Sequence, residues 1–267
     1  MTKQFKIYFK INFAKQAQYR SAALSGTATQ IFFGFMQIMV FMAFLGTSSS
    51  SGFSIPQMSS YIWLRQVFYP MFIFYNSHHH ILSQILNGDI SYGLIKPVKM
   101  YNQWFYDMYS SNVAKVLFRA PILLLVVLLL PAGWGLMLPA SWINLLLFIL
   151  SFFISSVLIV TISIISYTIV TMTLSAGAVF GIINAVASLF AGQIVPLPLF
   201  PMWFQKLANF FPFRYVVDLP FRIYVGSIDP REALMFIGIQ VLWLVALMIF
   251  GKFFVKKRTN KLVVQGG

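Results

Sequence analysis

Long apolar runs separated by short polar breaks dominate the chain. A helix that crosses a membrane needs about 20 mainly apolar residues. Such runs occupy residues 22–46, 59–77, 113–136, 142–170, 177–195 and 233–251. They are long and continuous, which is typical of helices and not of the short alternating strands of a membrane barrel. The pattern therefore predicts an all-α membrane protein with six transmembrane helices.

Charged residues interrupt two of these runs. Arg65 falls inside residues 59–77, and we expect it to lie near the outer end of that helix and to extend toward the interface. Lys115 and Arg119 fall in the third run, where we expect them to anchor its inner end. By contrast, residues 120–205 contain no Asp, Glu, Lys, Arg or His. That stretch alone is long enough for more than two crossings.

The positions of the basic residues predict how the helices are oriented. The formal net charge is +14, and the basic residues gather at both chain ends and after the second run. Cytoplasmic segments carry an excess of Lys and Arg, so we expect both termini in the cytoplasm and an even number of crossings. Four basic residues of the opposite, outer segment count against this orientation: Lys206, Arg214, Arg222 and Arg231. Because the basic residues flank apolar runs, we expect a lipid bilayer and no nucleic acid as partner.

The N-terminal residues 1–21 carry five basic residues but no continuous apolar core, so we expect no cleaved signal peptide. Phe5, Phe9 and Phe13 share one side of a helix, while Lys6 and Lys10 lie on another. We interpret this segment as an amphipathic interfacial helix on the inner leaflet. A frayed basic tail is the alternative.

The composition excludes a soluble protein and argues against several kinds of catalysis. Hydrophobic residues make up 59% of the chain and charged residues 9%, with a mean hydropathy of +0.81, so a water-exposed surface cannot be built. There is no cysteine, which excludes disulfides and thiolate sites. No complete phosphate-loop motif occurs, and the adjacent His78, His79 and His80 diverge on a helix, which makes a poor metal site. We expect no enzyme activity, no directly bound cofactor and no metal, and the role of the histidines stays open.

A short mixed segment, residues 81–104, connects the second and third runs on the expected cytoplasmic side. Gly88 and Gly93 permit tight turns, and Pro97 ends any helix. Asp89 is one of only five acidic residues in the chain. A segment of this kind can dock into a groove of a partner protein, and an ordinary solvated connection is the alternative.

The outer segment, residues 196–226, is rich in proline and aromatic residues. Its prolines prevent one continuous helix, and the spacing of Trp203, Leu207 and Phe210 or Phe211 predicts a short amphipathic helix between Pro201 and Pro212. The segment is either an interfacial cap or a re-entrant outer gate. The gate candidates are Pro196, Pro198, Phe200, Pro201, Trp203, Phe204, Phe210 and Phe211.

Small residues recur at helical spacing in the fifth run. The stripe consists of Gly177, Gly181, Ala185, Ser188 and Gly192. Such a face lets another helix approach closely. The second helix belongs either to the same subunit or to the partner in a dimer.

Two stretches resemble the ABC-2 family of ABC-transporter permeases, in particular its branch of small six-helix members. Residues 87–104 resemble the family's segment after the second helix, through Gly88, Asp89, Ile90, Leu94, Lys96 and Pro97. Gly192 with residues 195–204 and 219–226 resembles the proline-rich segment before its last helix. The six runs and the basic ends extend the resemblance over nearly the whole chain.

The resemblance implies a permease that pairs with an identical or similar subunit and binds two copies of a separate ABC ATPase, which carries the ATP and Mg²⁺. It implies that the N-terminal helix and residues 84–97, including Gln84, transmit ATPase motion to the membrane helices. It also implies a re-entrant outer segment over residues 193–213 and a location in the plasma membrane of a bacterium. The family offers no counterpart for the three histidines.

The scarcity of charged residues also bears on the cargo and on the mode of transport. Few fixed charges are present to recognise a small ion, which favours a hydrophobic or amphipathic cargo such as a peptide, a lipid-linked molecule or a drug. A secondary carrier is one alternative, although no acidic residue lies near the middle of a predicted span. A membrane anchor or immunity subunit for an ATPase, without transport, is the other.

Overall fold

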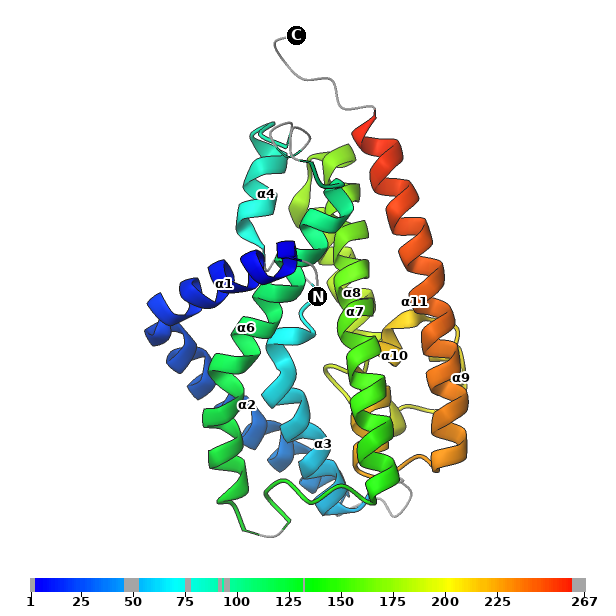
Figure 1. The fold of residues 1–267 in the computed structure, drawn as a ribbon. Helices are drawn as coiled ribbons and strands as arrows, with labels where there is room; N and C mark the ends of the chain where they lie inside the picture. The colour runs from blue at the N-terminus through cyan, green and yellow to red at the C-terminus, as the bar shows by residue number, and fades with distance from the viewer. Residues whose placement is uncertain are drawn as a thin grey trace.

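A computed structural model describes residues 3–45, 53–74, 78–90, 93, 97–131 and 133–260, without the side chains of residues 44 and 45. Within these residues the chain forms helices and no strand (Figure 1), which confirms the predicted all-α class. The helices are α1 (Lys3–Gln18), α2 (Arg20–Leu45), α3 (Ile55–Phe68), η1 (Tyr69–Met71), α4 (His79–Leu86), α6 (Met100–Leu128), α7 (Trp142–Thr173), α8 (Ala176–Phe190), η2 (Leu197–Leu199), α9 (Met202–Ala208), α10 (Pro212–Tyr224) and α11 (Pro230–Thr259).

Four of the described helices are long and apolar enough to cross a membrane: α2 over Arg20–Ala43, α6, α7 and α11. The helix that contains the predicted third span begins before residue 113, because α6 starts at Met100. Its first turns are less apolar than a membrane run. They are helical because Trp104 and Met108 are buried in the core while Gln103 and Asp107 bond to neighbouring segments.

The two remaining predicted spans are shorter than expected. α3 has 14 residues and ends at Phe68, because Pro70 has no backbone N–H to continue the helical ladder. α8 has 15 residues and ends at Phe190. The observed helices do not extend to the ends of the predicted ranges 59–77 and 177–195, and residues 75–77 lie outside the described residues. Six crossings stay a prediction.

Interhelical packing centres on α7, whose apolar run contacts both α10 and α11. Gln240 of α11 is fully buried there. Its Nε2 lies 2.7 Å from Oγ of Ser155 and 2.7 Å from the carbonyl oxygen of Tyr215, while Oγ of Ser151 donates to its Oε1 at 3.1 Å. Within an apolar interior such bonds fix the register of three helices.

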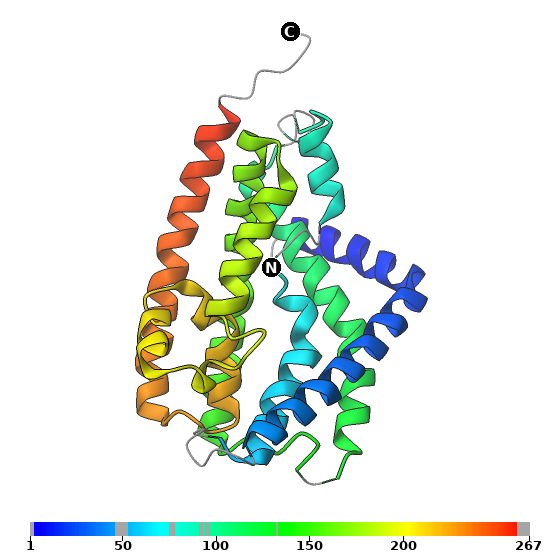
Figure 2. The same ribbon diagram turned by 180° about the vertical axis from the view of Figure 1, so that it is seen from behind.

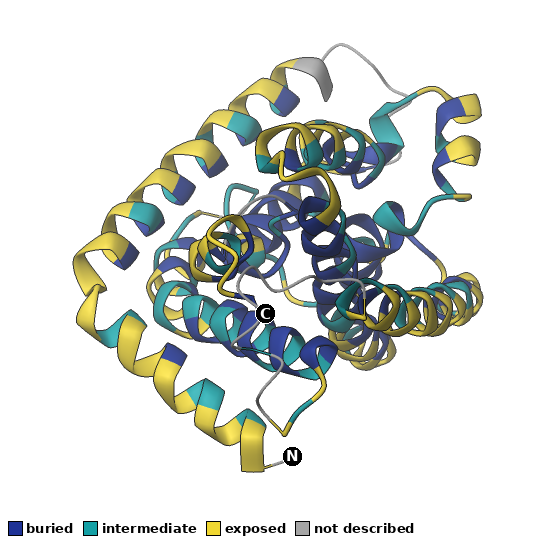
Figure 3. Cartoon of the chain, turned by 90° about the horizontal axis from the view of Figure 1, so that it is seen from above, coloured by how far each residue is buried: buried dark blue, intermediate teal, exposed yellow. Residues whose placement is uncertain are grey.

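The first two helices lie on the outside of the bundle. α1 crosses the bundle at a steep angle and packs against α6, and α2 then runs along α3 and α6 (Figures 1 and 3). Each presents one face to the bundle and leaves the opposite face exposed (Figure 3). The structure therefore places the N-terminal segment as an ordered helix across the bundle. A frayed tail does not describe residues 3–18.

The proline-rich outer segment folds into η2, α9 and α10, side by side with the lower parts of α7 and α11 (Figure 2). The short helix predicted between Pro201 and Pro212 is α9. α10 is almost wholly buried although it contains Pro220. Its last turn is tied to the loop before α7, where the N–H of Ala140 donates to the carbonyl of Tyr224 at 3.2 Å.

Candidate functional site

The candidate coupling segment begins with α4, a short amphipathic helix at the end of the bundle that also holds the C-terminal end of α11 (Figure 1). We call this end of the molecule the α4 end. Ile81 and Ile85 are buried against the bundle, while Gln84 is half-buried. α4 therefore rests on the bundle by one apolar stripe and keeps its other face free.

A tight turn follows α4 and exposes the acidic residue of the segment. Gly88 adopts φ +80°, a left-handed conformation that favours glycine. The N–H of Ile90 then donates to the carbonyl of Gln84 at 3.1 Å, and the Ile90 side chain is buried. Asp89, between Gly88 and Ile90, is exposed, so the turn presents a carboxylate on the outside of the molecule.

Gln103 of α6 holds the far part of this segment. Its Nε2 donates to the carbonyl of Gly93 at 2.9 Å and to that of Val98 at 2.6 Å. Pro97 is exposed next to this anchor. Leu94 and Lys96, two further candidates for coupling, lie outside the described residues. The structure thus brings Gln84, Ile90 and the flanks of the segment together against α6.

Asp107 of α6 connects the segment to the N-terminal helix. Its Oδ2 lies 3.4 Å from Nδ1 of His80 in α4. Its Oδ1 accepts a hydrogen bond from Nδ2 of Asn12 in α1 at 3.0 Å, and the same Nδ2 lies 2.8 Å from Oγ of Ser110. Sequence reasoning did not select Asp107. The signal that would have found it is the scarcity of acidic residues.

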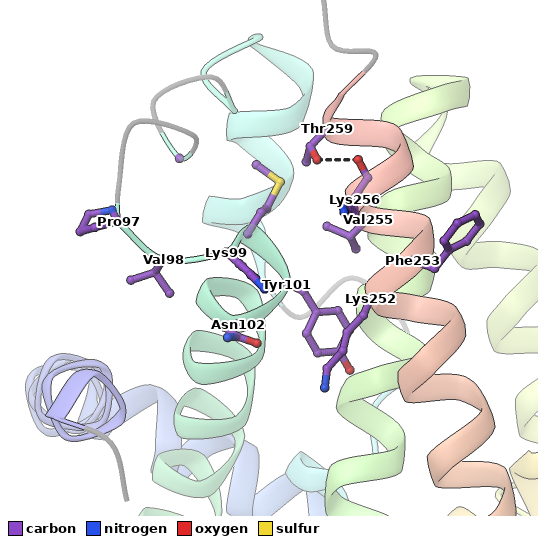
Figure 4. Close-up of a pocket in the computed structure, with 12 residues that line it drawn as sticks. Pro97, Val98, Lys99, Tyr101, Asn102, Lys252, Phe253, Val255, Lys256 and Thr259 are labelled. Carbon is purple, nitrogen blue, oxygen red and sulfur yellow. Dashed lines mark hydrogen bonds between the residues drawn. The ribbon is translucent and has the colours of Figure 1, made fainter.

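An open cleft of about 710 Å³ separates the start of α6 from the end of α11 (Figure 4). Lys99, Lys252 and Lys256 line it together with Tyr101 and Pro97. Lys252 and Tyr101 point toward one another across the cleft (Figure 4), with Nζ 5.9 Å from the ring centre. The cleft is lined by basic side chains and borders the candidate coupling segment.

The three histidines have separate environments. His78 is buried, and its backbone N–H donates to Oη of Tyr167 at 3.1 Å. Burial lowers the pKa of His78 well below its usual value, and the charge of Lys115 lowers it further. His79 and His80 are exposed. Among the described residues no group of three His, Cys, Asp or Glu side chains is placed to hold a metal.

The small-residue stripe of α8 divides into two parts. Gly177, Gly181 and Ala185 are exposed, and a Cβ added at either glycine would meet nothing within 4 Å in the described chain. Ser188 is buried. Gly192 lies beyond the end of α8 with φ +67°, so its place in a helical stripe is wrong. Only the first part offers a face for another helix.

The outer aromatic residues also divide. Phe204 and Phe211 pack around Phe190 at the end of α8, with ring centres 5.2 and 4.4 Å from it. Phe200 stacks on Phe204 at 4.5 Å. Pro196 is buried, Pro198 is partly buried and Pro201 is exposed, whereas Trp203 and Phe210 are exposed apolar side chains. The segment thus joins an aromatic cluster to an apolar outer face.

Two charged groups that sequence reasoning placed at interfaces are turned into the protein. Arg65 is 8% exposed and its Nη2 donates to the carbonyl of Gln193, so the expected extension toward the interface is wrong. Arg119 of α6 reaches α2: a Cβ on Gly26 would lie 2.7 Å from its Cζ. Its guanidinium therefore packs against α2, and Arg119 lies well inside α6 and not at an end of it.

A further buried charge was missed in the outer segment. Asp218 of α10 is fully buried. Its Oδ2 lies 3.8 Å from Nε of Arg214 and 3.6 Å from Nη1 of Arg222, and its Oδ1 accepts a hydrogen bond from Oη of Tyr61 at 2.9 Å. Two of the four basic residues that counted against the predicted orientation are thus internal ion-pair partners.

Four long apolar helices, with the helix α1 packed across them, define a membrane-embedded helical protein. The family model for ABC-2 family transporter proteins matches residues 29–266, and the chain belongs to this family. Its members are membrane components of ABC transporters that lack catalytic activity of their own and associate with an ABC ATPase. No curated protein and no solved structure matches the chain.

Proposed function

We propose that this chain is the membrane-spanning subunit of an ATP-driven exporter for a hydrophobic or amphipathic cargo, such as a peptide, a lipid-linked molecule or a drug. Two copies of a separate ATPase bind ATP and Mg²⁺ and hydrolyse the ATP. A second permease subunit, identical or similar, completes the transport path. The complex lies in the plasma membrane of a bacterium, with the α4 end facing the cytoplasm.

The observation that carries this proposal is the double contact of Asp107. Its carboxylate meets His80 of α4 and Asn12 of α1 at the same time. A push on α4 or on the turn at Asp89 therefore reaches both α1 and the long helix α6. Because packed helices move as rigid bodies, a displacement of α6 at this end extends along its length.

The docking surface for the ATPase consists of the exposed turn at Asp89, Pro97 and the basic cleft beside it. ATP binding closes the two ATPase subunits and moves this surface. The cleft lysines Lys99, Lys252 and Lys256 attract an acidic segment of the ATPase and increase the rate of association. The exposed Pro97 adds a rigid apolar contact.

The transport path lies between two permease subunits in this proposal. The exposed glycines Gly177 and Gly181 allow a helix of the second subunit to approach α8 closely. On the other side of the membrane, the aromatic cluster around Phe190 and Phe204 closes the path. Opening this cluster releases the cargo outward.

Purification from the native host in mild detergent tests the proposal. We expect an ATPase that carries a phosphate-loop motif to co-purify, and to be lost when residues 88–97 are scrambled. The control replaces Trp203 and Phe210 by Ala at the other end of the molecule, where both are exposed, and keeps the ATPase. Size-exclusion chromatography establishes that each variant is folded.

Transport in reconstituted vesicles then separates export from the two other functions. Uptake of cargo that requires ATP, and is unaffected when ion gradients are dissipated, supports the exporter. Transport driven by a gradient without ATP contradicts it and indicates a secondary carrier. If the chain binds the ATPase but a host that lacks the chain still shows wild-type export and resistance, the chain is a membrane anchor or immunity subunit.

A further inference from the structure

A second cavity lies away from the α4 end, between α2, α3, α8 and α10. Its volume is about 290 Å³. Polar side chains from three helices line it, namely Gln37 of α2, Arg65 and Gln66 of α3, and Asn184 of α8. Phe72 and Val217 provide apolar walls. A cavity with several polar groups and one charge is unusual within an apolar bundle and indicates a binding site.

The guanidinium of Arg65 is only partly satisfied by the protein. Arg65 is 8% exposed, and its Nη2 donates to the carbonyl of Gln193. Its Nη1 is buried and has no hydrogen-bond partner among the described residues. Within the same part of the chain no carboxylate lies within 4.0 Å of it. A buried cation in this state has lost its hydration without gaining a full set of acceptors or a counter-charge.

Asp218, the acidic group on the far side of Tyr61 from Arg65, is already shared. Asp218 lies within ion-pair distance of Arg214 and Arg222. Arg65 approaches this carboxylate only through Tyr61, whose ring centre is 5.6 Å from the Arg65 Cζ and whose Oη donates to Asp218. Two guanidinium groups thus share this carboxylate, and Arg65 lies outside ion-pair distance of it. An anion in the cavity supplies the counter-charge that Arg65 lacks, because Arg65 is the charged side chain among the lining residues.

We infer that the cavity at Arg65 binds an oxyanion, a phosphate or carboxylate group, and that this group belongs to the amphipathic cargo. The inference rests on the proposed transport function and adds the chemistry of the cargo to it. The free Nη1 and the amides of Gln37 and Asn184 supply donors for the anion. The apolar walls accept the part of the molecule next to the headgroup.

The chemistry of the cavity favours an oxyanion over other ligands. A guanidinium presents planar N–H donors that match a phosphate or carboxylate in a two-point contact. A metal cation is repelled by the same charge. A neutral amphiphile leaves the charge of Arg65 unbalanced, so it binds less well than one with an oxyanion.

Thermal unfolding of the purified full-length chain in dodecyl maltoside tests this inference with two probes, dodecyl phosphate and inorganic phosphate. The detergent itself supplies a neutral molecule with the same alkyl chain. A ligand that binds only the folded state raises the unfolding temperature. We expect dodecyl phosphate to raise it by about 2–4 °C for a chain of this size, and Arg65→Gln to abolish the shift. The matched control Arg231→Gln changes an exposed arginine and retains it.

The two probes distinguish the sources of the anion. A shift with dodecyl phosphate alone assigns the site to an anionic amphiphile, and an equal shift with inorganic phosphate assigns it to a free anion. No shift with either probe, or an equal shift in Arg65→Gln, overturns the site. If Arg65→Gln does not fold, Arg65→Lys and Gln37→Leu take its place, and an undiminished shift in both overturns the site. Because no ATPase is present, failure here leaves the co-purification result untouched.

Discussion

Nδ2 of Asn12 lies 3.0 Å from Oδ1 of Asp107, and through this contact the N-terminal helix α1 is attached to the long helix α6. Both residues are buried. The other oxygen of the same carboxylate faces His80 of α4 at 3.4 Å. One acidic side chain therefore links the helix that crosses the bundle to the helix that we propose receives the motion of the ATPase.

Removing this contact should weaken both stability and coupling. We expect Asp107→Ala to destabilise the chain by about 1–3 kcal/mol, because the buried amide of Asn12 loses a hydrogen-bond partner. Asn12→Ala should cost a similar amount, and the double variant should cost less than the sum, since both changes remove one interaction. Thermal unfolding of the four proteins in detergent measures the coupling energy. Gln4→Ala, an exposed change on the same helix, is the control, and strict additivity would contradict the contact.

The buried His78 predicts a pH dependence of stability. Its folded pKa lies well below the usual value because of burial, whereas the unfolded chain binds a proton near pH 6.5. Below about pH 6.5 the unfolded state therefore binds more protons, so the free energy of unfolding decreases as the pH falls. We expect His78→Gln to reduce this decrease between pH 7.5 and 5.5, and the exposed His79→Gln to leave it unchanged. Unfolding temperatures across this range measure the difference, and identical slopes in all three proteins would contradict the assignment.

Gln240 should contribute to the stability of the contact between α7, α10 and α11. Gln240→Leu keeps a side chain of similar size but leaves the hydroxyl of Ser155 and the carbonyl of Tyr215 without its N–H donors. We expect a loss of about 1–3 kcal/mol, seen as an unfolding temperature lowered by several degrees. Leu242→Ala, which changes a side chain that is 69% exposed on the same helix, is the control. An unchanged unfolding temperature in Gln240→Leu would show that the network does not contribute.

Two glycines should respond differently to substitution. A Cβ on Gly34 of α2 would lie 2.4 Å from Cζ3 of the buried Trp63, so Gly34→Ala should destabilise the chain by about 1–3 kcal/mol through overpacking. A Cβ on Gly181 of α8 meets nothing within 4 Å in the described chain. Gly181→Leu should therefore leave the unfolding temperature of the isolated chain unchanged.

The second half of this comparison tests the proposed dimer. If a second subunit packs on α8, Gly181→Leu should decrease the dimeric fraction at equal protein concentration, because the added side chain keeps the helices apart. Light scattering after size-exclusion chromatography in detergent measures that fraction. A dimer that is unaffected by Gly181→Leu and by Gly177→Leu would place the subunit contact on another face.

The apolar runs alone were enough to predict the long helices α7 and α11. The run 142–170 predicted α7 within three residues of its observed end at Thr173, and the last run lies wholly within α11. An uninterrupted apolar stretch of this length has to satisfy its backbone within itself in lipid, which leaves the helix as the solution. The placement of α9 between two prolines follows from the same local reasoning, because proline limits where a helix can continue.

The positions of the polar groups were decided by the tertiary structure. α6 extends through Gln103 and Asp107 because α1 and the coupling segment supply their hydrogen-bond partners, and no local pattern contains those partners. Arg65 was expected at the interface and Asp218 was not selected from the sequence, yet both are buried in one network between α3 and α10. The sequence by itself determined that the chain is a helical membrane protein, since length and apolarity are local properties. Only the fold decided which of its few charges meet, because burial and pairing depend on segments that lie far apart along the chain.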